Sequence, residues 1–251
     1  MRGSLLYPLA MHFFRRIFTR ALLRDLPARL LPGACALCGA NDAGLLCADC
    51  QRQVTPPSMR CERCAIAITS SHRLCARCIA EPPAFDASFA AVAYAPPIDE
   101  LVQALKFRGQ LPHAASFARL LLHAVPRDAV ADASLLIAVP LSEQRLAMRG
   151  FNQAHEIARP LARAWRLKLA TDACVRVRDT EPQSALALGR REDNMRGAFA
   201  VARREAIIGA HVLVVDDVMT TGHTLDALAA CLKRHGAARV TNIVFARTPL
   251  R

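Results

Sequence analysis

Two adjacent carboxylates, Asp216 and Asp217, follow an apolar run at residues 212–215 and precede a short polar loop. The loop consists of Thr220, Thr221, Gly222, His223 and Thr224. A buried strand delivers such side chains to one edge of a sheet, and the N-terminus of the next helix binds anions through free N–H groups. Carboxylates repel phosphate, so the aspartates are expected to serve sugar hydroxyls or hydrated Mg²⁺ beside it. The pattern indicates a ribose 5-phosphate site. The alternative is a helix capped by threonine with two incidental acids.

A second chemical pattern lies near the N-terminus, where four C-x-x-C pairs occur within 44 residues. Two such pairs complete one tetrahedral four-thiolate site, so eight thiols predict two structural zinc ions. We expect adjacent pairs to group together, with a cross-braced grouping as the alternative. The predicted ligands are Cys35, Cys38, Cys47 and Cys50, then Cys61, Cys64, Cys75 and Cys78.

A disulfide framework in a secreted protein is the competing interpretation of these cysteines. The apolar run at residues 5–14 is followed by Arg15 and Arg16, without a small-residue cleavage site typical of a signal peptide. We therefore predict reduced thiols, zinc and a cytoplasmic location. Cys174 and Cys231 lie outside the module and are expected to be core thiols.

The elements that must position the acidic pair alternate between strands and helices. Apolar runs predict strands at residues 135–139, 211–215 and 240–246, and a weaker strand at 174–177. Helices are predicted from Ile98, over residues 151–165 with a kink or break at Pro160, and over residues 225–234. This order predicts an α/β fold with a doubly wound, mostly parallel sheet behind a small Cys-rich zinc module.

Residues 212–224 resemble the signature of type I phosphoribosyltransferases, which bind 5-phosphoribosyl 1-pyrophosphate (PRPP). More narrowly, the chain resembles the ComF/GntX-like family of competence-associated proteins over roughly residues 33–248. The matching features are the cysteine module, Leu-Lys-Phe-Arg-Gly at 105–109, Val-Pro-Leu at 139–141, Arg-Gly-Phe-Asn-Gln at 149–153, and Gln183 with Arg191 and Asn194. The resemblance implies the type I phosphoribosyltransferase fold.

The same resemblance implies roles for individual residues. Asp216 and Asp217 would be catalytic and hold the ribose hydroxyls, residues 220–224 would hold the 5-phosphate, and Mg²⁺ would bridge pyrophosphate and ribose oxygens. Arg149 would neutralise the pyrophosphate; Arg145 could do the same or could lie on a solvated helix face.

Two further groups of residues acquire roles from the resemblance. Residues 179–198 could form a flap whose Arg191 and Asn194 contact pyrophosphate, with Gln183 a weaker candidate and a plain surface loop the alternative. Lys106 could contact a phosphate or merely complement the dipole of its helix.

The predicted organisation has three parts: an amphipathic helical segment (1–30), the zinc module (31–82) and the phosphoribosyltransferase-like domain (83–251). The first segment is expected to pack on the protein, or alternatively to touch a membrane surface peripherally. A membrane-spanning protein is not expected, because the apolar stretches are too short. The net charge of +12 is nearly all arginine, which partly reflects codon bias, so it does not by itself indicate nucleic-acid binding.

Three functions compete at this point. The first is a phosphoribosyltransferase that takes PRPP with Mg²⁺ and an unknown acceptor. The second is a single-stranded-DNA-binding accessory of DNA uptake or recombination, which would also contact proteins of those processes. The third is a PRPP sensor without turnover. The first is preferred, with a role in DNA uptake.

Overall fold

The computed structural model describes residues 33–42, 44–56, 58–69, 72–177 and 197–249. The chain divides into two compact units, residues 1–51 and 52–251. In the first unit the described part is a cysteine-bearing turn, closed by an antiparallel bridge between Ala34 and Asn41 and followed by helix α2 (Ala48–Val54). The predicted N-terminal helix and its membrane contact lie outside the described residues.

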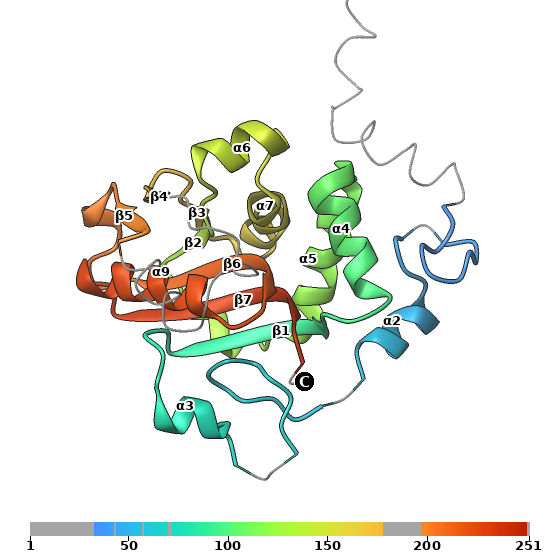
Figure 1. The fold of residues 1–251 in the computed structure, drawn as a ribbon, viewed down its shortest axis with the longest axis horizontal. Helices are drawn as coiled ribbons and strands as arrows, with labels where there is room; N and C mark the ends of the chain where they lie inside the picture. The colour runs from blue at the N-terminus through green and yellow to red at the C-terminus, as the bar shows by residue number, and fades with distance from the viewer. Residues whose placement is uncertain (1–32, 43, 57, 70–71, 178–196, 250–251) are drawn as a thin grey trace, which may run out of the picture. The chain divides into compact units, whose positions relative to one another are not determined.

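The second unit contains a five-stranded sheet whose pairs are all parallel, in the order β1-β7-β6-β2-β3. Strands β1, β7 and β6 lie side by side in Figure 1. The five strands are β1 (Ala87–Ala93), β2 (Leu135–Ala138), β3 (Lys168–Leu169), β6 (His211–Met219) and β7 (Arg239–Arg247). The predicted α/β fold with a parallel sheet is confirmed.

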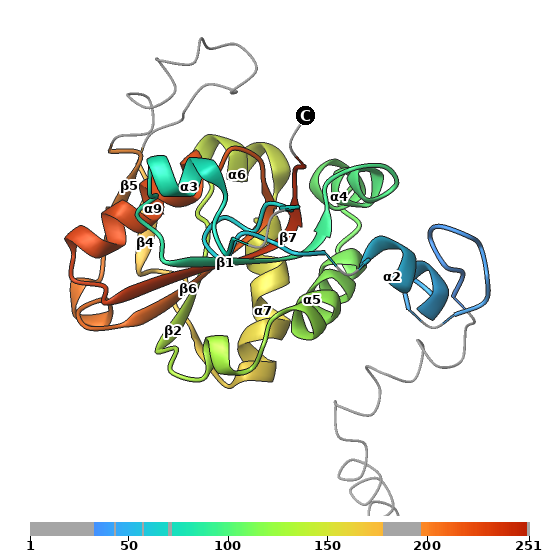
Figure 2. The ribbon, with the colours of Figure 1, turned by 90° about the horizontal axis from the view of Figure 1, so that it is seen from below.

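Helices connect these strands and cover both faces of the sheet. They are α3 (Ala76–Ala80), α4 (Ile98–Arg108), α5 (Pro112–Ala124), α6 (Glu143–Arg149), α7 (Gln153–Trp165) and α9 (His223–Arg234), with short 3₁₀ turns at Asp128–Val130 and Arg204–Ala206. Figure 2 shows α5 and α7 on one side of the strands and α9 and α3 on the other.

Burial explains this double covering. All five residues of β6 from His211 to Val215 are buried, as expected for a strand with no solvated face. On the α5 side, the rings of Phe117 and Phe245 stack with centroids 3.6 Å apart. On the α9 side, Val214 and Leu228 belong to one apolar core. Alternate side chains of the same strands therefore fill two separate layers.

The structure refines three local expectations. The strand predicted at 174–177 forms as β4 (Cys174–Arg176), but it pairs antiparallel with β5 (Phe199–Val201) in a separate two-stranded sheet. Helix α7 continues through Pro160 without a break. Strand β6 runs four residues past the predicted end at Val215, because Asp216 and Met219 remain paired with β7.

Candidate PRPP-binding site

The loop between β6 and α9 has the geometry of an anion site. Strand β6 ends at Met219, and α9 begins at His223 after Gly222, whose φ is 88°. A Cβ at Gly222 would lie 2.7 Å from Met219 Cε, so both the backbone angle and the space require glycine. The N–H groups of the first turn of α9 have no partners within the helix and can face an anion.

The side-chain hydroxyl of Thr221 is the group of this loop that most directly favours an anion ligand. Its Oγ1 is buried and has no hydrogen-bond partner among the residues that the structure describes. A buried hydroxyl without a partner is energetically unfavourable, so most such groups in proteins are satisfied by protein, water or ligand. An oxygen-rich anion at the N-terminus of α9 would satisfy it.

The acidic pair lies in β6 just before this loop. Asp217 is only 2% exposed, and its Oδ2 lies 2.6 Å from Nζ of Lys106 in the last turn of α4. The backbone N–H of Asp217 donates to Oδ1 of Asp216 at 2.9 Å. Lys106 therefore does more than complement a helix dipole: it neutralises one of two adjacent carboxylates.

Lys106 balances only one of the two adjacent carboxylates, so in the free protein Asp216 favours its protonated form. Burial, and then the charge of Asp217, raise the pKa of Asp216 well above its ordinary value, while Lys106 lowers it only in part. Burial lowers the pKa of Lys106, but the charge of Asp217 and the ion pair with it outweigh burial and raise that pKa, so the amine stays protonated. A second cation at this position would displace the proton of Asp216 and favour the ionised form of that carboxylate.

The loop after β2 brings Arg149 toward the same carboxylates. Asn152 anchors this loop: its side chain donates to the carbonyl of Val139 at 3.0 Å and accepts from the first N–H groups of α7. Arg149 Nη1 donates to Oε1 of Gln153 at 2.5 Å. Burial lowers the pKa of Arg149, and the charges of Asp217 and Asp216 oppose that shift, which shows that the guanidinium lies within electrostatic reach of the pair.

The eight predicted zinc ligands form two groups in which all sulfur atoms lie within 4.8 Å of one another. Adjacent pairs group together, as preferred from the sequence: Cys35, Cys38, Cys47 and Cys50 form cluster 1, and Cys61, Cys64, Cys75 and Cys78 form cluster 2. The cysteines of the described residues are all free thiols, so a disulfide framework is not formed. The two Cys₄ clusters are consistent with two structural zinc ions.

Backbone donors prepare these thiols to bind a cation. The N–H of Cys75 donates to the sulfur of Cys61 at 3.3 Å, and the N–H of Cys47 donates to that of Cys35 at 3.4 Å. Burial raises the pKa of Cys61, but hydrogen bonds from the backbone of Cys64, Cys75 and Arg63 outweigh it and lower the pKa to about 7. A thiol of this kind ionises readily and becomes a metal ligand.

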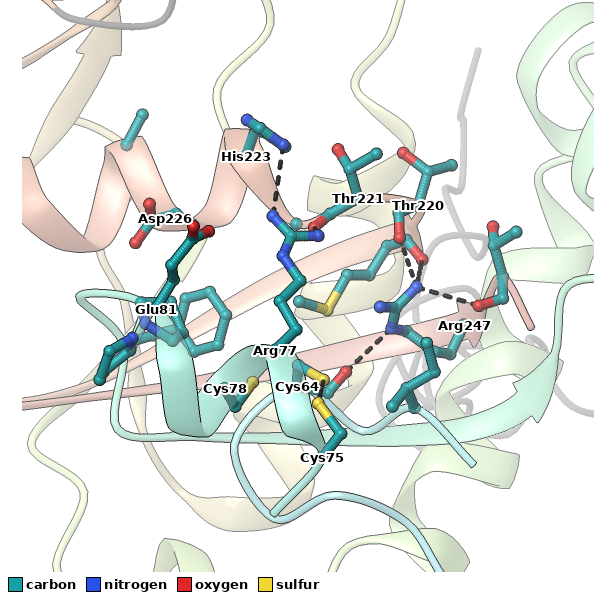
Figure 3. A pocket seen from close by; sticks show the side chains of 18 of the residues that line it. Cys64, Cys75, Arg77, Cys78, Glu81, Thr220, Thr221, His223, Asp226 and Arg247 are labelled. Carbon is teal, nitrogen blue, oxygen red and sulfur yellow. Dashed lines mark hydrogen bonds between the residues drawn. The ribbon is translucent and has the colours of Figure 1, made fainter. Parts of the chain in front are cut away.

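A cavity of about 1280 Å³ lies between α3 and α9 (Figure 3). It borders the loop of residues 220–224, which we call the phosphate loop because of the ligand predicted for it. Its lining includes Arg77, Thr221, His223, Asp226 and Arg247. Among the described residues that line it, neither Asp216 nor Asp217 occurs. The loop thus borders two different environments, the acidic pair and this cavity.

Comparison with known proteins agrees with both the domain that carries the sheet-edge site and the cysteine module. Residues 146–250 match the phosphoribosyl transferase domain, and residues 26–81 match the double zinc ribbon domain. The DNA utilization protein YhgH of Escherichia coli O6:H1 is 34% identical over 225 residues, which cover 87% of this chain and 98% of that protein. The chain belongs to the ComF/YhgH family.

Two other relatives extend the comparison. Competence protein F of Haemophilus influenzae is 31% identical over 201 residues, which cover 78% of this chain and 87% of that protein. Competence protein ComFC of Bacillus subtilis is 32% identical over 115 residues, 45% of each chain. The resemblance inferred from the sequence motifs is confirmed.

The structure brings some of the predicted site residues together, while others lie elsewhere or outside the described residues. Lys106, Arg149, the acidic pair and the phosphate loop gather at the C-terminal edge of the sheet. Arg191, Asn194 and Gln183 lie outside the described residues. Arg145 lies in α6, a helix with no buried residue. No helix in the described part of the chain is long and apolar enough to cross a membrane.

Three contributions were missed from the sequence. The ring Nε2 of His223 lies 3.4 Å from Nη2 of Arg77 in the cysteine module. Arg77 Nη1 also donates to the carbonyl of Thr221 at 3.2 Å. Arg247, at the end of β7, donates to the carbonyl of Met219 at 3.0 Å. No local motif marks either arginine, because both act across long sequence separations.

Proposed function

We propose that this protein binds PRPP together with Mg²⁺ at the C-terminal edge of its sheet. The observation that carries the proposal is the buried, unpartnered Thr221 hydroxyl in the loop next to the acidic pair. A ligand for this edge must present an anion to the loop and hydroxyl groups or a cation to the carboxylates. A ribose 5-phosphate carries the first two groups, and PRPP adds a pyrophosphate that binds Mg²⁺.

The residues divide the work as follows. Residues 220–224 hold the 5-phosphate through N–H groups and hydroxyls, and Asp216 and Asp217 hold the ribose hydroxyls or the Mg²⁺ ion. Lys106 pairs with Asp217 and holds it in position, and Arg149 faces the pyrophosphate. When bound, Mg²⁺ would neutralise charge on the pyrophosphate leaving group.

The reaction that this arrangement suits is phosphoribosyl transfer. An acceptor would form a bond to the anomeric carbon of the ribose as the bond to pyrophosphate breaks, and pyrophosphate would leave with the electron pair. The arginine and lysine side chains stabilise that developing negative charge. Because the relatives are named for DNA utilization and competence, we assign the protein a cytoplasmic role in DNA uptake, with zinc as a structural element in both clusters.

Calorimetric titration of Thr221→Val with PRPP and Mg²⁺ tests the phosphate assignment. Removing the hydroxyl should weaken PRPP binding about tenfold to a hundredfold, the effect of one hydrogen bond to a charged group. Thr171→Val is the matched control, because Thr171 is exposed and lies far along the chain from the loop. Equal affinities for the two variants would contradict the assignment.

Binding of single-stranded DNA is the second candidate function, favoured by one feature of α4 and α6. The side chain of Phe107 is 73% exposed, and the Arg149 guanidinium lies 5.3 Å from its ring centroid. Met148 beside it is 80% exposed. An exposed aromatic ring next to cationic groups is a typical stacking platform for an unpaired base.

Fluorescence anisotropy with a labelled oligothymidine tests this second function. Phe107→Ala should weaken binding about tenfold, as expected for one lost stacking contact. The control Ile208→Ala removes a comparably exposed apolar side chain from another surface and should leave binding unchanged. Absence of binding at low salt, or equal effects of both variants, would exclude this platform.

A further inference from the structure

A buried arginine connects cluster 2 to the phosphate loop. Arg247 closes strand β7 and is only 5% exposed. Its Nε donates to the carbonyl of Cys64, a ligand of cluster 2, at 2.9 Å. Its Nη1 faces the carbonyls of Met219 at 3.0 Å, of Thr220, and of Thr248 at 3.0 Å. Figure 3 shows this guanidinium between the cysteine module and the loop.

Because the guanidinium of Arg247 is buried, it depends on the backbone carbonyls on both of its sides. Among the described residues, no carboxylate forms an ion pair with Arg247, so backbone carbonyl dipoles take over the solvation that water would supply. A buried cation is strongly unfavourable without such partners. The rigid, planar fork of arginine can reach acceptors on two sides at once, which a lysine amine cannot do in the same geometry. The positions of the Cys64 and Met219 carbonyls are therefore tied to each other.

A second connection runs parallel to the first. Arg77 lies in α3, between cluster 2 ligands Cys75 and Cys78, and it contacts the carbonyl of Thr221 and the ring of His223. Cluster 2 also shares its apolar surroundings with the loop: Cys64 and Cys78 belong to the same core as Met219. Cluster 1, by contrast, belongs to the compact unit of residues 1–51.

We infer that cluster 2 acts through Arg247 to hold the phosphate loop in its binding conformation, so that ligand binding at the loop depends on the metal in cluster 2 and not on that in cluster 1. Arg247 is a positioning residue, because it donates to the loop backbone on the side of the cysteine module. The inference rests on PRPP as the proposed ligand, and the tests separate the two ideas.

The first test compares matched cysteine variants of the zinc-loaded full chain. Cys75→Ser/Cys78→Ser removes half of cluster 2, and Cys47→Ser/Cys50→Ser removes the equivalent half of cluster 1. We expect the cluster 2 variant to bind PRPP about tenfold more weakly, within the range usual for coupled sites, and the cluster 1 variant to bind as the unmodified chain does. Equal effects of both pairs would overturn the inference.

A second variant tests the role of Arg247 while both metal clusters stay intact. It also provides a test should the cluster 2 variant fail to fold. Arg247→Lys keeps the positive charge and both cysteine clusters. We expect two zinc ions per chain to be retained, faster amide hydrogen exchange at residues 219–224, and weaker PRPP binding. Unchanged exchange and unchanged affinity in a variant with full zinc would overturn the inference.

The mutual effect of PRPP and zinc on each other's binding gives a further test. An arginine that only stabilised the fold would not change this effect. If cluster 2 strengthens PRPP binding, PRPP must strengthen zinc binding at cluster 2 by the same factor. The share of zinc that a chromogenic chelator removes at equilibrium should therefore fall when PRPP and Mg²⁺ are added to the unmodified chain, but not with Arg247→Lys. Should the unmodified chain bind no PRPP, the proposed function fails, while hydrogen exchange without PRPP still decides the coupling.

Discussion

Replacing Asp216 by asparagine should stabilise the free protein at neutral pH while removing its proposed function. In the folded protein, burial and the neighbouring Asp217 raise the pKa of Asp216 well above the ordinary 3.8. The folded state therefore holds a proton that the unfolded state has released. The stability contributed by this group is fully present below the ordinary pKa and is lost as the pH rises through the folded pKa.

The size of this effect is fixed by linkage. A difference of one bound proton changes the free energy of unfolding by about 1.4 kcal/mol per pH unit. Asp216→Asn removes the titrating group but keeps an Oδ1 that can accept from the N–H of Asp217. The difference in unfolding free energy, variant minus original, should therefore rise with pH by up to about 1.4 kcal/mol per unit until the folded pKa is passed.

Urea unfolding of both proteins between pH 5.5 and 8, with zinc present, measures this difference. Zinc-linked effects are common to the two proteins and cancel in the comparison. Asp172→Asn is the control, because the Asp172 side chain is 57% exposed and pairs with an exposed Arg203; an equal pH trend in both variants would place its cause outside the buried pair. A flat difference for Asp216→Asn would refute a raised pKa, and retention of Mg²⁺-dependent PRPP binding would refute the role of this carboxylate.

Three other changes have defined outcomes. Lys106→Met leaves the buried carboxylate of Asp217 without its cation and should destabilise the fold by about 3 kcal/mol, measured by urea unfolding at pH 7. A loss below about 1 kcal/mol would contradict the importance of the ion pair. Gly222→Ala should lower the free energy of unfolding by about 1–3 kcal/mol and weaken PRPP binding, because φ is 88° and the new Cβ would meet Met219. Thermal unfolding measures the first effect and calorimetry the second. An unchanged melting temperature would contradict the strain at this position. Burial raises the pKa of Asp86, but the ion pair with Lys233 and the N–H of Val240 outweigh burial and lower that pKa below the ordinary 3.8. Asp86→Asn should therefore destabilise by about 1 kcal/mol at pH 7, and in denaturant titrations the penalty should shrink as the pH falls below 3.8. A penalty independent of pH would argue against the ion pair.

The sequence was sufficient for those parts of the molecule whose chemistry is local. Residues 212–224 carry strand, acids, loop and helix start in one continuous stretch, and C-x-x-C pairs impose their own short-range geometry. The parallel sheet followed from buried apolar runs alternating with helices. These features do not depend on contacts between distant parts of the chain.

Long-range contacts could not be predicted. The partner of Asp217 is Lys106, more than one hundred residues earlier, and nothing in the helix around Lys106 distinguishes this pairing from a plain helix-dipole contact. The same holds for Arg247, an ordinary strand-end arginine in the sequence, which in the structure spans the cysteine module and the phosphate loop. The strand at 174–177 went to a second sheet because its side chains alternate between buried and exposed positions, which suits an outlying pair better than a fully covered strand.

The most direct test of the PRPP assignment is a calorimetric titration of the zinc-loaded, unmodified chain with PRPP, with and without Mg²⁺. The account predicts saturable binding of one PRPP per chain that requires Mg²⁺ and is displaced by ribose 5-phosphate, which shares the groups expected at the loop and the acidic pair. Absence of saturable binding in the presence of Mg²⁺, or binding that ribose 5-phosphate does not displace, would contradict it.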